Sequence, residues 1–147
     1  MHFEGVFEVK APKEKVFWIL MDPNQISQCM PDLQNLDVKS PDDYTVVVRA
    51  GVSFIKGDFT LHFNVAEKSP PTHAKLNAHG TGIGSSVDME TTMDIADAQE
   101  GGSSMKWAAD AKVGGRIASL GQRMLESQAE KIIRQLFDCM QHKLESV

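Results

Sequence analysis

The chain has 147 residues, of which 41% are hydrophobic and 24% are charged, and its formal net charge at pH 7 is −5. This size and composition are typical of one globular domain with a sizeable core, so we expect residues 1–147 to form a single domain. The acidic balance argues against a nucleic-acid partner, which would require a basic surface. No run of 18 apolar residues is present that could span a membrane.

The N-terminus lacks the charged and apolar regions of a signal peptide, which favours a cytoplasmic protein. Cys29 and Cys139 stand far apart in the sequence and in no metal-binding spacing. A disulfide between them stays open at this point. In a reducing cytoplasm, we expect two free buried thiols instead.

The N-terminal part predicts a strand followed by two short helices. Residues 2–10 alternate between apolar and polar, which is typical of a half-buried strand whose inner residues are Phe3, Phe7 and Val9. Pro12 suits the first position of a helix, whose buried side is formed by Val16, Phe17, Ile19 and Leu20. Asp22 is a good N-cap for a second helix, and Pro31 ends it.

The middle of the chain predicts antiparallel strands joined by hairpins. A period of two between apolar and polar residues marks them, and they cover residues 33–39, 44–50, 58–65, 73–79, 87–95 and 105–113. The spacing Gly80-x-Gly82-x-Gly84 is similar to a phosphate-binding loop. Such a loop needs a following helix, and here a strand follows. We therefore expect these glycines to form a bend at a sheet corner or the rim of a cavity.

The C-terminal segment 115–147 predicts one long helix of roughly 45 Å. Its apolar residues recur at helical spacing, and they are Ile117, Leu120, Met124, Leu125, Ile132, Leu136, Met140 and Leu144. Ile117, Leu120 and Met124 share a helix face with Gln128. The apolar residues further along the helix are centred more than a quarter-turn away around its axis. Either the first half covers a cavity mouth while the second packs on the core, or the helix has a second apolar side for a partner.

The order of elements is a strand, two short helices, about six strands and a long helix. An α+β architecture satisfies it with the fewest assumptions: a curved antiparallel sheet of about seven strands wrapped around the C-terminal helix. This arrangement resembles the helix-grip fold of the START-like (SRPBCC), birch-pollen-allergen-like superfamily.

Several local motifs narrow the resemblance to the family of the carbon monoxide dehydrogenase G subunit. They occur in the family's order, and they are Phe3-x-Gly5, Ala11-Pro12, Val16-x-Trp18, Asp22-Pro23, Gly57-Asp58-Phe59, Trp107-Ala108-Ala109-Asp110 and Gly114-Gly115. The resemblance implies an accessory role beside a molybdenum-containing dehydrogenase, helping the complex to reach the membrane or a lipophilic electron acceptor such as a quinone. Two features depart from the family: Pro31-Asp32 replaces a usual proline-glycine, and the membrane-attaching tail of some members is missing after Val147. Contact with a membrane stays open, but we expect no anchor in this chain.

The predicted inner face of the sheet is almost wholly apolar and rich in methionine, an adaptable residue that is frequent at promiscuous binding surfaces. We therefore expect a cavity for a hydrophobic small molecule between the sheet and the last helix. Its predicted lining residues are Phe59, Leu61, Phe63, Leu76, Met89, Met93, Met105, Trp107, Ile117, Leu120 and Met124. Tyr44, Thr91 and Gln128 are the polar side chains predicted to point inward, although Gln128 also fits a residue at the boundary of the helix face.

Other functions remain as alternatives. No catalytic constellation is visible, so we expect no enzyme, and a START-like cyclase or aromatase would require the three inward polar residues to converge. A pure interaction module would instead expose an apolar patch over Ile133 and Phe137. His62, His73 and His79 lie beside acidic residues but lack metal-ligand spacing, so we interpret them as surface residues and expect neither metal nor cofactor. The sequence leaves both a monomer and a homodimer open.

Overall fold

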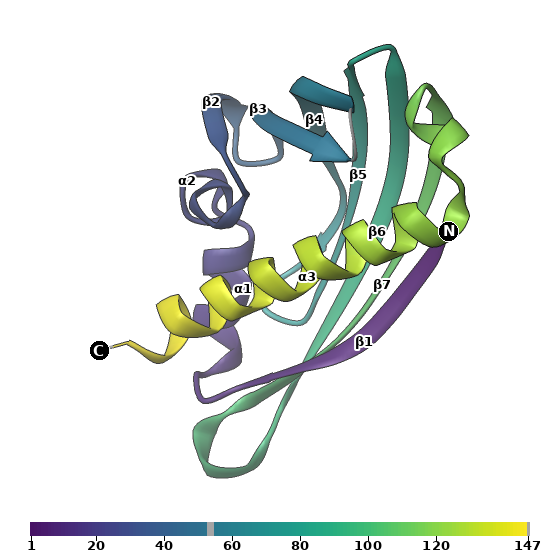
Figure 1. Ribbon diagram of the computed structural model, residues 1–147. Coiled ribbons are helices and arrows are strands. Elements are labelled where there is room, and N and C mark those ends of the chain that lie inside the picture. Colours follow the sequence, from purple (N-terminus) through teal and green to yellow (C-terminus); the bar gives the residue numbers. More distant parts are fainter. Residues whose placement is uncertain (53–54, 147) are drawn as a thin grey trace.

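The structure is a computed structural model that describes residues 1–52 and 55–146. Its helical elements are α1 (Lys13–Leu20), α2 (Pro23–Ile26), η1 (Ser27–Cys29), η2 (Gln99–Gly101), η3 (Ile117–Leu120) and α3 (Gln122–Glu145). Its strands are β1 (His2–Val9), β2 (Leu33–Ser40), β3 (Asp43–Val52), β4 (Ile55–Ser69), β5 (His73–Gly82), β6 (Ser85–Asp97) and β7 (Ser103–Gly115). The described strands form one antiparallel sheet in the order β1-β7-β6-β5-β4-β3-β2, and this sheet curls around α3 (Figure 1). The predicted helix-grip fold is confirmed.

The strand register gives the sheet two faces of opposite chemistry. Directly paired residues of neighbouring strands point to the same side. We call the side of the sheet toward α3 the inner face. One row of residues across this face consists of Tyr44, Phe63, Ala78, Met89 and Ala111. The next row along the strands consists of Val65, Leu76, Thr91, Ala109 and Phe3. The opposite side, the outer face, carries the polar residues between them, as the alternation predicts.

The N-terminal helices cover one end of the inner face. Val16, Phe17 and Leu20 of α1 are buried, as predicted from their spacing. The Asp22 side chain accepts a hydrogen bond from the backbone N–H of Asn24 at 2.9 Å and so caps α2. These short helices close one end of the core without covering the other.

The C-terminal helix begins later than the sequence predicts. β7 continues to Gly115, η3 follows, and α3 begins only after Gly121. Gly115 and Gly121 have φ values of 81° and 90°, which glycine adopts readily and which interrupt a helix. The 24 residues of α3 therefore span about 36 Å instead of roughly 45 Å.

This break explains the apparent drift of the apolar stripe. Ile117 and Leu120 belong to η3 and not to α3, so they do not share a helix face with Gln128. The expected inward direction of Met124 is wrong, because its side chain is 41% exposed. Its neighbour Leu125 is half-buried and begins the inward stripe of α3 instead.

The two cysteines are bonded, contrary to the expectation of free thiols. Cys29 in η1 and Cys139 in α3 form a disulfide whose Cα atoms lie 5.6 Å apart. The bond joins the C-terminal half of α3 to the short helices at the end of the core. The sequence alone could not favour this pairing, because 110 positions separate the two residues.

The glycine-rich segment is a hairpin, in agreement with the predicted bend. Ile83 and Gly84 both have positive φ, as the two central residues of a tight I′ hairpin require. They connect Gly82 to its partner Ser85 at the ends of β5 and β6. Gly80 has another role, because a Cβ atom at this position would collide with the side chains of Phe59 and Leu61.

Candidate functional site

The inner face is divided into a packed half and an open half. In the packed half, Phe7, Ile95 and Met105 are buried together with Met140 and Leu144 of α3. The open half, defined by Leu61, Phe63, Leu76, Met89 and Ala111, points to the same side of the sheet but is only half-buried. Along β6 alone, burial decreases from Ile95 and Met93 to Thr91, Met89 and Val87.

The position of α3 accounts for this division. Its Phe137 ring stacks on Phe7 with centroids 4.8 Å apart, and its centroid lies 5.2 Å from that of Trp107. Gly5 makes room for this cluster, because its Cβ would lie 3.0 Å from the Trp107 ring. The fully buried side chains of α3 are Met140 and Leu144, both in its last two turns. The first turns therefore cover the sheet without sealing it.

The predicted lining residues fall into three groups. Phe59, Met93 and Met105 are buried in the core. Leu61, Phe63, Leu76, Met89, Trp107, Ile117 and Leu120 are half-buried. Met124 is exposed on α3 and points away from the sheet. The half-buried group borders accessible space and is the part that a ligand could contact. Sequence reasoning missed Leu125 and Ala129, the half-buried residues of the first turns of α3, because it placed the helix start too early.

The three predicted inward polar residues do not form one cluster. Tyr44 on β3 is 3% exposed, and burial raises the pKa of its phenol to about 12. Its ring stacks on Phe63 with centroids 5.0 Å apart. Thr91 lies three strands away on β6, and Gln128 is half-buried on α3. Within the described residues no hydrogen bond joins any two of them.

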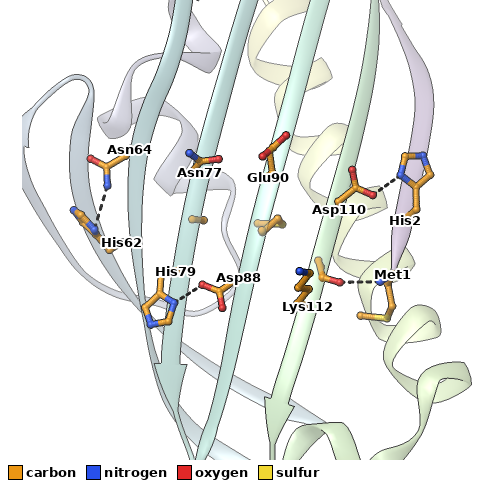
Figure 2. Close-up of a pocket in the computed structure, with 13 residues that line it drawn as sticks. Met1, His2, His62, Asn64, Asn77, His79, Asp88, Glu90, Asp110 and Lys112 are labelled. Carbon is orange, nitrogen blue, oxygen red and sulfur yellow. Dashed lines mark hydrogen bonds and ion pairs between the residues drawn. The ribbon is translucent and has the colours of Figure 1, made fainter.

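The outer face carries a broad hollow of about 670 Å³, shown in Figure 2. Two histidines that line it pair with carboxylates: His79 lies 2.6 Å from Asp88, which also lines the hollow, and His62 lies 2.6 Å from Asp43 beside it. At the edge strand β1, His2 lies 2.7 Å from Asp110. The sequence placed His62 and His79 on this face, but it did not reveal the hollow, which depends on how the sheet curves.

His73 lies between two carboxylates on the same outer face. Its ring nitrogens lie 2.8 Å from Glu67 and 2.7 Å from Asp94, and these hydrogen bonds raise its pKa above 6.5. Hydrogen bonds that His2 donates to Asp110 and Glu4 similarly raise its pKa. In the described part of the chain, no three His, Cys, Asp or Glu side chains are arranged to hold a metal ion. The outer pairs are exposed to water, so they suit surface electrostatics better than chemistry that excludes water.

The sequence matches, over residues 5–145, the family model of CoxG, the G subunit of carbon monoxide dehydrogenase. The chain belongs to this family. No protein with a curated description matches it. Among the described helices of this CoxG-family protein, none is long and apolar enough to cross a membrane.

Solved structures confirm the helix-grip fold. A conserved protein from Geobacillus kaustophilus is 29% identical, with a TM-score of 0.91 over 98% of this chain and 95% of its own. A START superfamily protein from Mycobacterium smegmatis is 13% identical, with a TM-score of 0.73 over 98% and 97%. The Zhui aromatase/cyclase from Streptomyces sp. R1128 is 14% identical, with a TM-score of 0.71 over 99% and 93%. The likeness to the last two shows the fold alone.

Proposed function

We propose that this CoxG-family protein binds an apolar, lipid or quinone-like molecule between the open half of the inner face and the first turns of α3. The observation that carries the proposal is the contrast in burial along a single apolar surface. Leu61, Phe63 and Met89 point inward yet stay half-buried, while residues further along the same face are sealed by α3. Covering the remaining apolar area with a ligand would be favourable, at about 25 cal/mol per Å² removed from water.

The family suggests the setting in which such a ligand would be used. We propose an accessory role beside a carbon monoxide dehydrogenase-type molybdenum enzyme, in which the protein holds a lipophilic molecule for the complex. The matched family supports this role, because it is described as part of a dehydrogenase. The ligand and the partner enzyme are parts of the proposal.

We propose a binding role and not catalysis, because the inward polar groups are dispersed. Tyr44 and Thr91 lie three strands apart, so these two described residues do not come within hydrogen-bond reach of each other. The alternative of a pure interaction module predicts an exposed apolar patch over Ile133 and Phe137. Both residues are half-buried, and Phe137 packs against Phe7 and Trp107, which supports the binding role over this alternative.

Native mass spectrometry of the purified protein, followed by lipid extraction, tests the proposal directly. We expect a retained apolar molecule, or saturable binding of an added quinone. Binding can be followed by fluorescence in a Trp18→Phe background, in which Trp107 is the remaining tryptophan. If no ligand is retained and neither quinone nor fatty acid changes the fluorescence or the melting temperature, the proposal is wrong.

A matched pair of substitutions tests the location. Ala111 and Ala108 are both half-buried on β7, but Ala111 lies on the inner face and Ala108 on the outer face. Ala111→Trp should fill the open half and reduce ligand affinity at least tenfold, whereas Ala108→Trp should leave it within about twofold. Equal effects of the two substitutions would contradict the inner-face site.

A further inference from the structure

The hydroxyl of Tyr44 is a polar group without a hydrogen-bond partner among the described residues. Buried hydroxyls elsewhere on the inner face are satisfied: Ser103 donates to the carbonyl of Ala11 at 2.6 Å, and Ser85 accepts from the N–H of Ile117 at 2.9 Å. Folded proteins pair nearly all buried polar groups. An unpaired hydroxyl on a side chain that is only 3% exposed therefore requires an explanation.

The Tyr44 hydroxyl retains access to space outside the protein interior. Every fully enclosed side-chain nitrogen or oxygen in the described residues has a hydrogen-bond partner. Because the Tyr44 hydroxyl has none, it is not fully enclosed, and the small exposed fraction of this residue includes it. The ring lies in the same row as Phe63, Ala78 and Met89, and it stacks on Phe63 of the open half. The Tyr44 ring thus borders the open half of the inner face.

Among the described residues, the inner-face rows that contain Tyr44 and Val46 carry no charged side chain. The inner-face rows around it hold Phe63, Val46 and Leu61 together with other apolar or small residues. Placing an anion there would cost desolvation without a cationic partner.

We infer that the Tyr44 hydroxyl donates a hydrogen bond to an uncharged acceptor oxygen of the ligand. This inference rests on the proposed function and narrows it: the ligand is an apolar molecule that carries a carbonyl or similar neutral oxygen, and it is not a fatty-acid anion. The raised pKa of the phenol is consistent with this role, because the group keeps its proton throughout the physiological range.

The experiment compares three probes of equal chain length: methyl nonyl ketone, undecane and undecanoate. Their affinities are measured by Trp107 fluorescence in the Trp18→Phe background, for the parent protein and for Tyr44→Phe. The parent should bind the ketone more tightly than the alkane or the carboxylate. Tyr44→Phe should lower ketone affinity about fivefold and leave alkane affinity within twofold, as the loss of one neutral hydrogen bond predicts. Because the hydroxyl lacks a protein partner, Tyr44→Phe should also leave the melting temperature of the ligand-free protein unchanged or raised.

Thr91→Val is the matched control, because it removes another inner-face hydroxyl that has no partner among the described residues. It should preserve the ketone preference. If Tyr44→Phe keeps the full preference, if Thr91→Val loses it instead, or if undecanoate binds as tightly as the ketone, the role of Tyr44 is overturned while the proposed function stands. If neither the ketone nor the alkane binds the parent protein, the proposed function fails and the inference fails with it.

Discussion

The packed and open halves of the inner face are built from the same sheet and the same helix, yet they differ in burial. In the packed half, α1 contacts β6, α3 contacts β1, and the Cys29–Cys139 disulfide joins α3 to η1. In the open half, the first turns of α3 meet apolar strand residues that remain half-buried. The contrast indicates that stability is concentrated at one end, which leaves the other end free to accept a guest.

Separating the two tasks has a physical advantage. A fully packed core around α3 would exclude any ligand, because protein interiors leave few voids larger than a water molecule. A helix that was loose along its whole length would bury too little apolar surface to fold. Fixing α3 at its C-terminal half satisfies both requirements, and substitutions in each half can test that division.

The largest effect is expected from breaking the disulfide of the packed half. It closes a long loop, and losing such a native cross-link typically costs about 2–5 kcal/mol of unfolding free energy. Urea unfolding with and without a dithiol reductant measures the difference. Cys139→Ser is the control, since its stability should not respond to the reductant. An unfolding midpoint of the parent protein that is the same in both conditions would contradict the disulfide.

Two methionines of α3 compare its opposite sides directly. Met140 is fully buried and Met124 is 41% exposed. Met140→Ala should cost about 2–5 kcal/mol of unfolding free energy through lost contacts and a cavity. Met124→Ala should change it by less than about 0.5 kcal/mol. Similar losses for the two variants, measured by urea unfolding, would show that the assigned helix faces are wrong.

Tyr44 offers a spectroscopic test, because it is the only tyrosine in the sequence. Burial beside Phe63 should move its ionisation to a pKa of about 12, above the ordinary value of 10.0. The phenolate absorbance of the folded protein, followed during an alkaline titration, reports this group alone among tyrosines. Ionisation of the folded protein near the ordinary value would place the phenol in water and contradict its buried position.

The smallest change in stability is expected from substituting His73 on the outer face, which is exposed to water. Hydrogen bonds to Glu67 and Asp94 raise the folded-state pKa of His73 above 6.5. The protonated pair therefore stabilises the fold fully below the unfolded pKa, and this contribution is lost as pH rises through the folded pKa. NMR titration should show the raised pKa of His73. The parent protein should gain melting temperature as the pH is lowered from about 8 to about 6, and His73→Gln should reduce this gain. A His73 pKa at or below the ordinary value would contradict the ion pairs.

The sequence predicted the parts of the fold that depend on local periodicity. Alternation in β6 correctly assigned Met89, Met93 and Ile95 to the inner face. It could not predict which of them would be sealed, because that depends on where α3 lies. The helix start was misplaced because Ile117 and Leu120 keep a helix-like spacing within η3, and the break depends on the backbone of Gly115 and Gly121.

The most direct test of the central claim is methyl NMR of the methionines during titration with a short-chain quinone. Met89 lies in the open half and also lines the outer hollow, Met105 and Met140 lie in the packed half, and Met1 lines the outer hollow without belonging to the inner face. We predict that the Met89 signal shifts in a saturable manner while the signals of Met105, Met140 and Met1 stay nearly constant. A shift of the Met1 signal without a shift of the Met89 signal, or no saturable shift of any methionine signal, would contradict a binding site in the open half.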